Sequence, residues 1–559
     1  MNMYTWLEDV KAQPKKKPLP ILSFPGVQHL DGVTVRELVC SSALQAECMK
    51  KVADLTDSAA SVSFMDLSVE AEAFGADTLF FDDEVPAIQG AMVSSEEEAE
   101  ALAVPAVGAG RTGLFIDAIR LAAQQITDRP VFAGAIGPFS PAVGNALQRW
   151  AVEQTRLGIP LLFNSEGVHG ASINGSTIFP QQIGLASSFD PEVSRQMGHV
   201  IATESRASGI HEVWSPVMDL MRDPRFGRTE EAYGEDTFLA SEFARAGVRG
   251  MQGDDLTAPD AVACELKHYA AYGSPVAGLN CAPCAMSRHE VFTDSLPVFE
   301  AAVKDAGAMN VMCSYTCVGH KPVSMDHEML TEVLRDQWGM RGFVRADMTA
   351  VSRLYDWFYV ADTEEDAIKL SMEAGLDMEL HDFPHDVWQN GIRNLVQSGR
   401  MDRAVVEQAA RRVLRTKMLL GLFENPYVDE TLLPKVLHCQ EHQDLAEAIA
   451  RKTFVLLKNQ DNLLPLSKDL HTIALIGPSA GKAMFGDYCH HQENGVSLLQ
   501  GIRERLPHIN ILHEEGCSFR GNVPIPFGPG VFTDENGEPG LTGRYYNASV
   551  PGGEPGLTR

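Results

Sequence analysis

GIPLLFN (158–164) is the first of six short apolar runs that decide the fold. The others are HEVWSPVMD (211–219), VACELKH (262–268), AMNVMCSY (308–315), GFVRAD (342–347) and GLDMEL (375–380). Helical patterns separate them, such as 191–209 and 326–339. Apolar strands alternating with helices are typical of a parallel sheet covered on both faces. So many repeats favour a closed TIM-type (β/α)8 barrel in an α/β protein over an open doubly wound sheet.

Polar side chains gather where these strands are expected to end. They are Asn164, Ser165 and Glu166; Asp219; Lys267 and His268; Ser314 and Tyr315; Asp347; and Asp377 with Glu379. The C-terminal ends of all strands in a parallel barrel open onto one face, where catalytic groups collect. One such residue alone could simply cap a helix, but six strand ends in a row indicate a shared pocket. Its carboxylates, lysine and histidine suit sugar chemistry, in which one carboxylate attacks the anomeric carbon.

Length and charge exclude several classes of function. The 559 residues exceed the roughly 250–300 that one core supports, so at least two domains are expected. A formal net charge of −29 repels phosphate backbones and anionic lipid, so we expect no nucleic-acid or membrane partner. The first 20 residues lack the apolar core of a signal peptide, and the 10 cysteines are scattered as in reduced proteins. We therefore expect a cytoplasmic enzyme.

Two short motifs resemble cofactor-binding motifs but lack the spacing or the partner residues that binding requires. GPSAGK (477–482) lies in a predicted strand and turn at 471–487, but the spacing GxxxxGK[ST] of a phosphate loop is absent. Cys281 and Cys284 have CxxC spacing without a second pair or a histidine in range. We therefore expect neither a metal nor another cofactor. Beyond the barrel, residues 402–423 and 443–459 are predicted to be helices.

Five motifs beyond about Asn145 stand out: SPVMDLMRDPRFGRTEEAYGED (215–236), KHYAAYG (267–273), LRDQWGMRGFVRAD (334–347), AGLDMEL (374–380) and RKTFVLLKN (451–459). Through them this part of the sequence resembles glycoside hydrolase family 3, the retaining β-glucosidases, β-xylosidases and their relatives. The resemblance implies an O-glycosyl hydrolase that releases terminal β-linked sugars of the glucose or xylose type from oligosaccharides or glycosides. It also implies a barrel followed by an α/β sandwich domain.

The resemblance assigns roles to single residues. Asp347 falls where the family has its nucleophile, which forms the covalent glycosyl–enzyme. The positions that bind sugar in the first subsite are Glu166, Arg228, Lys267, His268 and Tyr315. Asp223 and Glu231 are expected to hold the RDPRFGR loop in shape rather than touch sugar. For Arg228, the alternative to sugar binding is an ion pair with a neighbouring carboxylate.

The sequence departs from the family pattern at two positions, and its general acid/base residue cannot be assigned. Glu166 stands where many members carry Asp, and the extra methylene shortens the pocket, which favours a pentose. Met348 replaces the aromatic residue that usually follows the nucleophile, so the preference for the next sugar is open. The general acid/base usually comes from the second domain. Here Asp487 and Glu493 are the candidates, without a motif to support either.

The first part of the chain has a different resemblance. MDLSVEAEAFGADTLFFDDEVPAIQGAMV (65–93) and RPVFAGAIGPFSPA (129–142) are similar to uroporphyrinogen decarboxylase and its corrinoid-dependent methyltransferase relatives. The expected organisation is an extension (1–19), a partial barrel segment of that family (20–142), the hydrolase barrel (143–425), the start of the sandwich domain (426–535), and the start of a protective-antigen-like sugar-binding insert (536–559).

Three functions therefore stay open from sequence. The first is a retaining glycoside hydrolase, its activity reduced because the second domain is cut short. The second is a decarboxylase or methyltransferase of the uroporphyrinogen type. The third is an inactive fusion of two families. A working pocket would require residues 20–140 to supply the missing barrel strands, with matching register and shear.

Overall fold

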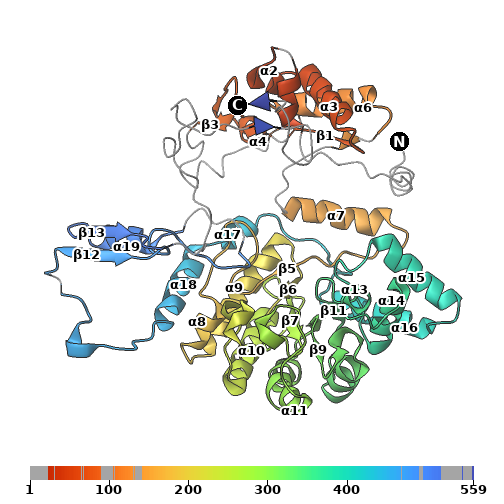
Figure 1. Cartoon of the computed structure of the whole chain (residues 1–559), viewed down its shortest axis with the longest axis vertical. Coiled ribbons are helices and arrows are strands. Elements are labelled where there is room, and N and C mark those ends of the chain that lie inside the picture. Colours follow the sequence, from red (N-terminus) through yellow and green to blue (C-terminus); the bar gives the residue numbers. More distant parts are fainter. Residues whose placement is uncertain are drawn as a thin grey trace. The chain divides into compact units, whose positions relative to one another are not determined.

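A computed structural model of the chain describes residues 23–30, 32–64, 66, 68–89, 105, 108–129, 131–132, 141–467, 469–489, 495–517, 544–545 and 557–558. The chain divides into two compact units, residues 1–139 and 140–559 (Figure 1). The expected extension over 1–19 and the candidate acid Glu493 lie outside the described residues.

Unit 1 is a small α/β body built on two helices that pack against each other. Its elements are η1 (Phe24–His29), α2 (Val35–Val39), α3 (Ser42–Thr56), β1 (Ser61–Val62), α4 (Ser68–Ala73), β2 (Thr78–Leu79), β3 (Ala87–Ile88), α6 (Thr112–Gln125) and β4 (Val131–Phe132). Helices α3 and α6 enclose a core that includes Leu38, Met49 and Phe64. β1 pairs with β4 in parallel, and β2 pairs with β3 in antiparallel fashion.

Unit 2 is organised around a five-stranded parallel sheet. Its strands are β5 (Asn164–Glu166), β6 (Glu212–Trp214), β7 (Ala263–Tyr269), β8 (Asn310–Cys313) and β11 (Val344–Ala346), in the order β11-β8-β7-β6-β5. Neighbours in space follow the chain order, as in a barrel. The predicted α/β class with a barrel-type parallel sheet is confirmed. Two predicted strands differ in extent: the first, 158–164, overlaps β5 only at Asn164, and the sixth is reduced, within the described residues, to one parallel bridge between Arg345 and Met378.

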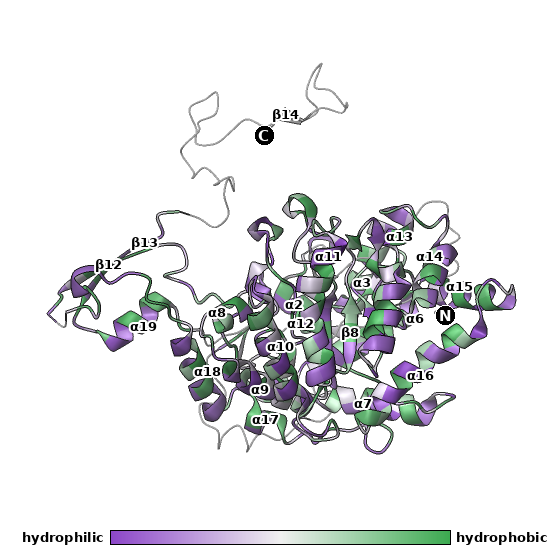
Figure 2. Cartoon of the chain, turned by 90° about the horizontal axis from the view of Figure 1, so that it is seen from below, coloured by the Kyte–Doolittle hydropathy of each residue, from purple (hydrophilic) through white to green (hydrophobic). Residues whose placement is uncertain are grey.

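Helices surround this sheet, as Figure 1 shows. They are α7 (Pro141–Gln154), α8 (Gln182–Ala186), α9 (Glu192–Ser208), α10 (Thr237–Gln252), α12 (Leu296–Glu300), the π-helix η8 (Glu328–Gln337), α13 (Arg353–Asp356), α14 (Glu364–Ala374), α15 (His385–Gln397) and α16 (Arg403–Leu419). The helices predicted over 191–209, 326–339 and 402–423 correspond to α9, η8 and α16. Figure 2 shows hydrophobic and hydrophilic residues alternating along α15 and α16, as expected for helices that cover a core.

Helix α9 illustrates why these residues form helices. Its buried side chains include Val193, Met197 and Val200, which recur at helical spacing and give one apolar face. The helix ends at Gly209, whose φ of 94° is left-handed. A glycine adopts this conformation without a steric penalty, so it is a natural helix terminator.

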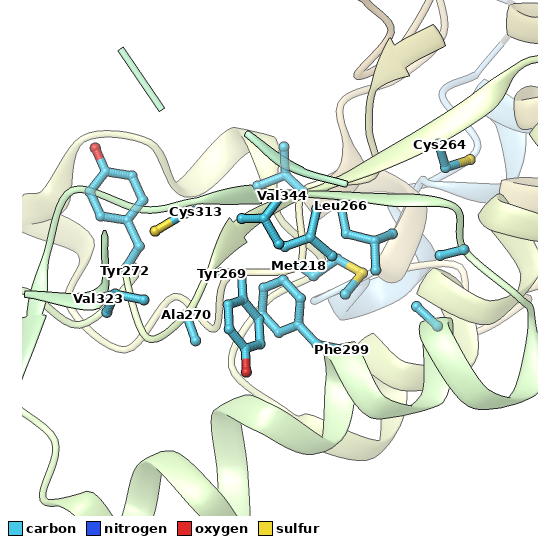
Figure 3. Close-up of a cluster of buried hydrophobic side chains, with 14 of the residues drawn as sticks. Met218, Cys264, Leu266, Tyr269, Ala270, Tyr272, Phe299, Cys313, Val323 and Val344 are labelled. Carbon is cyan, nitrogen blue, oxygen red and sulfur yellow. The ribbon is translucent and has the colours of Figure 1, made fainter. Parts of the chain in front are cut away.

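The core of unit 2 lies against β7, all seven residues of which are buried. Figure 3 shows Leu266 and Tyr269 from this strand beside Met218, Phe299 and Val344. The rings of Tyr269 and Phe299 meet edge-on, with centroids 5.2 Å apart. Because side chains of β7 meet the core on both faces, this strand is the centre of the sheet.

A buried ion network ties three strands together beneath the pocket. Arg345 on β11 donates through Nε to Glu265 of β7 (3.0 Å) and through Nη2 to Glu212 of β6. The rings of Trp214 and Phe343 lie 5.2 Å and 5.4 Å from the guanidinium carbon. All three charged side chains are almost completely buried. A buried charge is tolerated only when its partners are in place, so the network fixes the register of the three strands.

The chain beyond α16 begins a second α/β arrangement. Its elements are α17 (Leu433–Val436), α18 (Gln440–Lys452), β12 (Thr472–Ile476), α19 (Leu498–Arg505) and β13 (Asn510–Glu514), and β12 and β13 pair in parallel. β14 (Arg544–Tyr545) and β15 (Leu557–Thr558) pair in antiparallel fashion. The helix predicted over 443–459 ends earlier, at Lys452. β-Branched Thr453 and Val455 follow, and such residues disfavour helix.

Arg345→Met should destabilise the protein by about 3–5 kcal/mol, because it leaves Glu212 and Glu265 buried without their cation. Arg403→Met is the control, since Arg403 pairs with Glu407 on the surface. Urea unfolding followed by circular dichroism measures both variants. A change below about 1 kcal/mol for Arg345→Met would show that the network does not hold the strands.

Candidate active site

Asp347 lies directly after β11 with one carboxylate oxygen free. Its backbone N–H donates to the carbonyl of Cys313 (2.8 Å), and its Oδ1 accepts from the N–H of Met348 (2.7 Å). Oδ2 is buried and has no hydrogen-bond partner among the described residues, with His268 Nε2 3.7 Å away. Burial raises the pKa of Asp347 to about 6, although two cations nearby oppose this. The carboxylate is therefore mostly ionised at neutral pH, and one of its oxygens has no hydrogen-bond partner among the described residues.

His268 is held as a neutral ring in one tautomer. Burial lowers the pKa of His268 well below its usual value, and the charges of Arg228 and Lys267 lower it further. Nδ1 lies 2.7 Å from Asp219 Oδ2, and Nε2 lies 3.1 Å from Arg228 Nη2. Since a guanidinium can only donate, Nε2 accepts and Nδ1 carries the proton toward Asp219. Asp219 thus orients the ring, and its position after β6 is one of the predicted strand ends.

Arg228 is fixed by a carboxylate of its own loop. The loop contains the short helices η2 (Pro224–Phe226) and η3 (Thr229–Glu231). Nε and Nη2 of Arg228 donate to both oxygens of Glu231 (2.7 and 2.8 Å), and Nη1 donates to the hydroxyl of Tyr272 (3.0 Å). Burial opposes the charge, but Glu231 outweighs it and raises the pKa of Arg228. Arg228 therefore forms an ion pair with Glu231, the alternative that the sequence left open, and it also contacts His268 in the pocket.

Lys267 and Glu166 form a second charged pair at the strand ends. Lys267 Nζ, on β7, lies 2.6 Å from Glu166 Oε2, at the end of β5. Burial raises the pKa of Glu166, and the charge of Lys267 acts in the opposite direction. The lysine is almost fully buried, whereas the glutamate side chain is 19% exposed. Glu166 thus presents Oε2 to Lys267, and its side chain stays partly exposed.

Tyr315 follows β8 and belongs to a tyrosine pair. Its hydroxyl lies 2.6 Å from that of Tyr272, and the two rings meet edge-on with centroids 5.0 Å apart. Burial and the charge of Asp347 raise the pKa of Tyr315 to about 12. The phenol therefore stays neutral. The hydroxyl of Tyr315 contacts Tyr272 and not Asp347. Asp347 is therefore oriented by the backbone N–H of Met348.

Tyr488 is a site residue that the sequence analysis missed. It follows β12, yet its hydroxyl accepts from Arg228 Nη2 (3.0 Å) and its ring lies 4.2 Å from Lys267 Nζ. The carbonyl of Asp487 lies 2.7 Å from His169 Nε2, which anchors this segment to the barrel rim. An aromatic residue after a glycine-containing turn was the available signal, but nothing in the sequence links it to residues more than 200 positions earlier.

Within the described residues, the geometry supports neither Asp487 as the acid/base residue nor a metal site at Cys281 and Cys284. Asp487 is exposed, and its Oδ1 accepts from the N–H of Tyr488 (3.0 Å). Cys281 and Cys284 are free thiols. In the part of the chain that the structure describes, no three His, Cys, Asp or Glu side chains are placed to hold a metal.

No helix among the described residues is long and apolar enough to span a membrane.

The fold and the pocket define a class. Carboxylates, a lysine and a neutral histidine lie at the strand ends of a barrel-type parallel sheet, and an arginine joins them from a loop, as the chemistry of a glycoside hydrolase requires. Residues 142–416 match the model of the glycosyl hydrolase family 3 N-terminal domain, and residues 454–544 match that of the family's C-terminal domain. Over these residues the chain belongs to glycosyl hydrolase family 3. Residues 26–144 match the uroporphyrinogen decarboxylase model.

Named relatives agree with this assignment. A putative β-xylosidase from Formosa agariphila is 37% identical over 337 residues, 60% of this chain and 44% of that protein. A periplasmic β-glucosidase from Salmonella typhimurium is 36% identical, over 68% of this chain and 50% of that protein. A β-glucosidase from Listeria innocua, solved in complex with glucose, superposes with a TM-score of 0.64 at 33% identity, covering 73% of this chain and 56% of that one. The chain thus spans about half the length of these proteins.

Asp347→Asn should stabilise the protein at neutral pH. The folded pKa of about 6 lies above the reference value of 3.8, so ionisation of Asp347 costs stability above pH 6 and nothing below about pH 4. The variant should gain up to about 3 kcal/mol at pH 7.5 and lose this gain near pH 4. Thermal unfolding at several pH values measures it. A lower melting temperature at pH 7.5 would mean that Asp347 holds the site together instead.

Proposed function

We propose that this protein is a retaining glycoside hydrolase that releases terminal β-linked sugars through a covalent glycosyl–enzyme on Asp347. The observation that carries the proposal is the free, buried Oδ2 of Asp347, 3.7 Å from His268 Nε2. A nucleophilic carboxylate needs one oxygen held in place and one oxygen that is not already hydrogen-bonded to the protein. Asp347 has this arrangement, because its Oδ1 is held by the N–H of Met348 (2.7 Å).

The reaction then follows in two displacements. In the first, Asp347 Oδ2 forms a bond to the anomeric carbon while the bond to the leaving oxygen breaks. That oxygen takes a proton from a general acid, or departs unaided when it is a stable phenolate. In the second, water attacks the same carbon, the bond to Asp347 Oδ2 breaks and restores the free carboxylate, and a proton of the water passes to the general acid/base or to solvent. Two inversions retain the β configuration.

The surrounding side chains supply sugar contacts and hold Asp347 ionised. The charges of Lys267 and Arg228 act against the rise in the pKa of Asp347 that burial causes. Cations beside a carboxylate favour its ionised form. Lys267 and Arg228 also have the donors that sugar hydroxyls require, and the carboxylate of Glu166 has the acceptors. The neutral ring of His268 contributes polarity without a further charge.

The matched relatives are about twice as long as the stretch that this chain covers. The substrates, the linkage, the domain boundaries and the acid/base residue are proposals. The cytoplasmic location stays a prediction, and the relative from Salmonella typhimurium is named as periplasmic.

Hydrolysis of 2,4-dinitrophenyl β-xyloside and β-glucoside tests the proposal. Dinitrophenolate leaves with little acid assistance, so the assay reports the nucleophile even without a general acid. Asp347→Asn should lower turnover by roughly a thousandfold or more. Asp356→Asn, which changes an exposed carboxylate nearby, is the control. Equal rates for the wild type and Asp347→Asn would refute the nucleophile.

Glu166→Asp should shift preference from xyloside toward glucoside. The shorter side chain lengthens the pocket by one methylene and makes room for the hydroxymethyl group of a hexose. A single methylene in a pocket is worth about 1–3 kcal/mol, so the ratio of kcat/KM values should change by about 10-fold or more. Lys267→Arg, which keeps the charge but not the geometry, should weaken both substrates equally. An unchanged ratio in Glu166→Asp would remove Glu166 as the selector.

A further inference from the structure

A second cavity lies away from Asp347 in unit 2. Its volume is about 610 Å³, and its lining includes Arg206, His211, Thr257, Asn425 and Tyr427. His211 directly precedes β6, whereas Asp219 and the pocket lie beyond the other end of that strand. The cavity therefore opens at the amino-terminal ends of the parallel strands. Side chains of the proposed sugar site take no part in it.

Arg206 makes this cavity unusual because its charge is not compensated. Nη2 donates to the carbonyl of Leu420 (3.3 Å), and the buried Nη1 has no partner among the described residues. No carboxylate in the same part of the chain forms an ion pair with this guanidinium. Nearby Lys417 likewise donates only to the carbonyl of Pro160 (2.8 Å). Burial lowers the pKa of both Arg206 and Lys417. Cations largely withdrawn from water are normally paired in proteins, so the unpaired, half-buried guanidinium of Arg206 on the cavity wall indicates a missing anion.

His211 adds a neutral donor to the same wall. Its Nδ1 accepts from the N–H of Phe163 (3.1 Å), so the ring proton must be on Nε2. No partner for Nε2 occurs among the described residues. Burial lowers the pKa of His211 to about 3, and the charges of Arg206 and Lys417 add to this effect. The imidazole thus stays neutral and offers an N–H at physiological pH.

The acidic residues around the cavity do not neutralise this wall. Glu424 and Asp429 are also in the lining, but both are exposed. Asp429 Oδ1 accepts from the N–H of Thr431 (2.9 Å), so part of its acceptor capacity is already used. Acidic groups in water are screened, whereas the buried guanidinium is not. The inner wall therefore favours an anion even though the mouth carries negative charge.

We propose that this cavity binds a small organic molecule that carries an oxyanion, such as a sugar phosphate or a uronate. The guanidinium of Arg206 and Nε2 of His211 would donate to the oxyanion. The volume lies within the range of small-molecule sites and far exceeds what a phosphate ion fills, so the ligand has a larger body. The ring of Tyr427, the amide of Asn425 and the hydroxyl of Thr257 suit a body with hydroxyl groups. This site is independent of the proposed hydrolase activity.

Calorimetric titration of the full chain with glucose 6-phosphate, glucuronate and inorganic phosphate tests the proposal, with neutral glucose as the control ligand. Arg206→Met should weaken the organic anion that binds by about 10- to 100-fold, the loss of one charge-assisted hydrogen bond, and should leave glucose binding unchanged. Arg195→Met, on the exposed face of the same helix, should change neither. Whichever organic anion binds identifies the oxyanion.

A second measurement separates binding from folding. Without ligand, Arg206→Met should melt at or above the wild-type temperature, because it removes an uncompensated buried charge. The organic anion should raise the melting temperature of the wild type only. Lys417→Met provides a second variant and should weaken binding less than Arg206→Met, because its ammonium acts at a distance. No binding of any anion at about 10 mM, or equal binding by wild type and both variants, would overturn the proposal.

Discussion

The buried pairing of Arg345 with Glu212 and Glu265 is the constraint on which the pocket depends. These residues come from β11, β6 and β7 and lie inside the sheet. Two residues beyond Arg345 stands Asp347, and two beyond Glu265 stands Lys267. A slip of one residue in any strand would turn these side chains to the opposite face. The ion network therefore fixes the register, and the register brings Asp347 and Lys267 to the same end of the sheet.

Above this network the pocket keeps polar atoms unsatisfied. Asp347 Oδ2 and Asp219 Oδ1 are buried and lack partners among the described residues. Most buried polar groups in proteins are hydrogen-bonded, so exceptions need an explanation. At Asp347 the proposed role as nucleophile is the explanation, because an oxygen without a protein partner keeps its lone pairs for the sugar carbon. The same unpartnered, buried carboxylate destabilises the folded protein, which is why removal of its charge is expected to increase stability.

Much of the site could be predicted because strand ends are local features. Glu166, Lys267, His268, Tyr315 and Asp347 all follow or close apolar runs, and parallel topology alone brings such positions together. The sixth strand was wrong in extent, since GLDMEL contributes only a bridge at Met378 in the described residues. Tyr488 and the single tautomer of His268 depend on contacts between distant segments. Sequence patterns carry no information about those contacts.

The central claim is that Asp347 becomes covalently bonded to a sugar in this chain. Incubation with 2,4-dinitrophenyl 2-deoxy-2-fluoro-β-xyloside, and with its glucoside counterpart, slows the second displacement and traps that species. Mass spectrometry of the intact protein and of its peptides then locates the label. We predict one fluorosugar per chain on the peptide that contains Asp347, and none in Asp347→Asn. A folded wild-type protein that releases no dinitrophenolate, or a label on another carboxylate, would contradict the account.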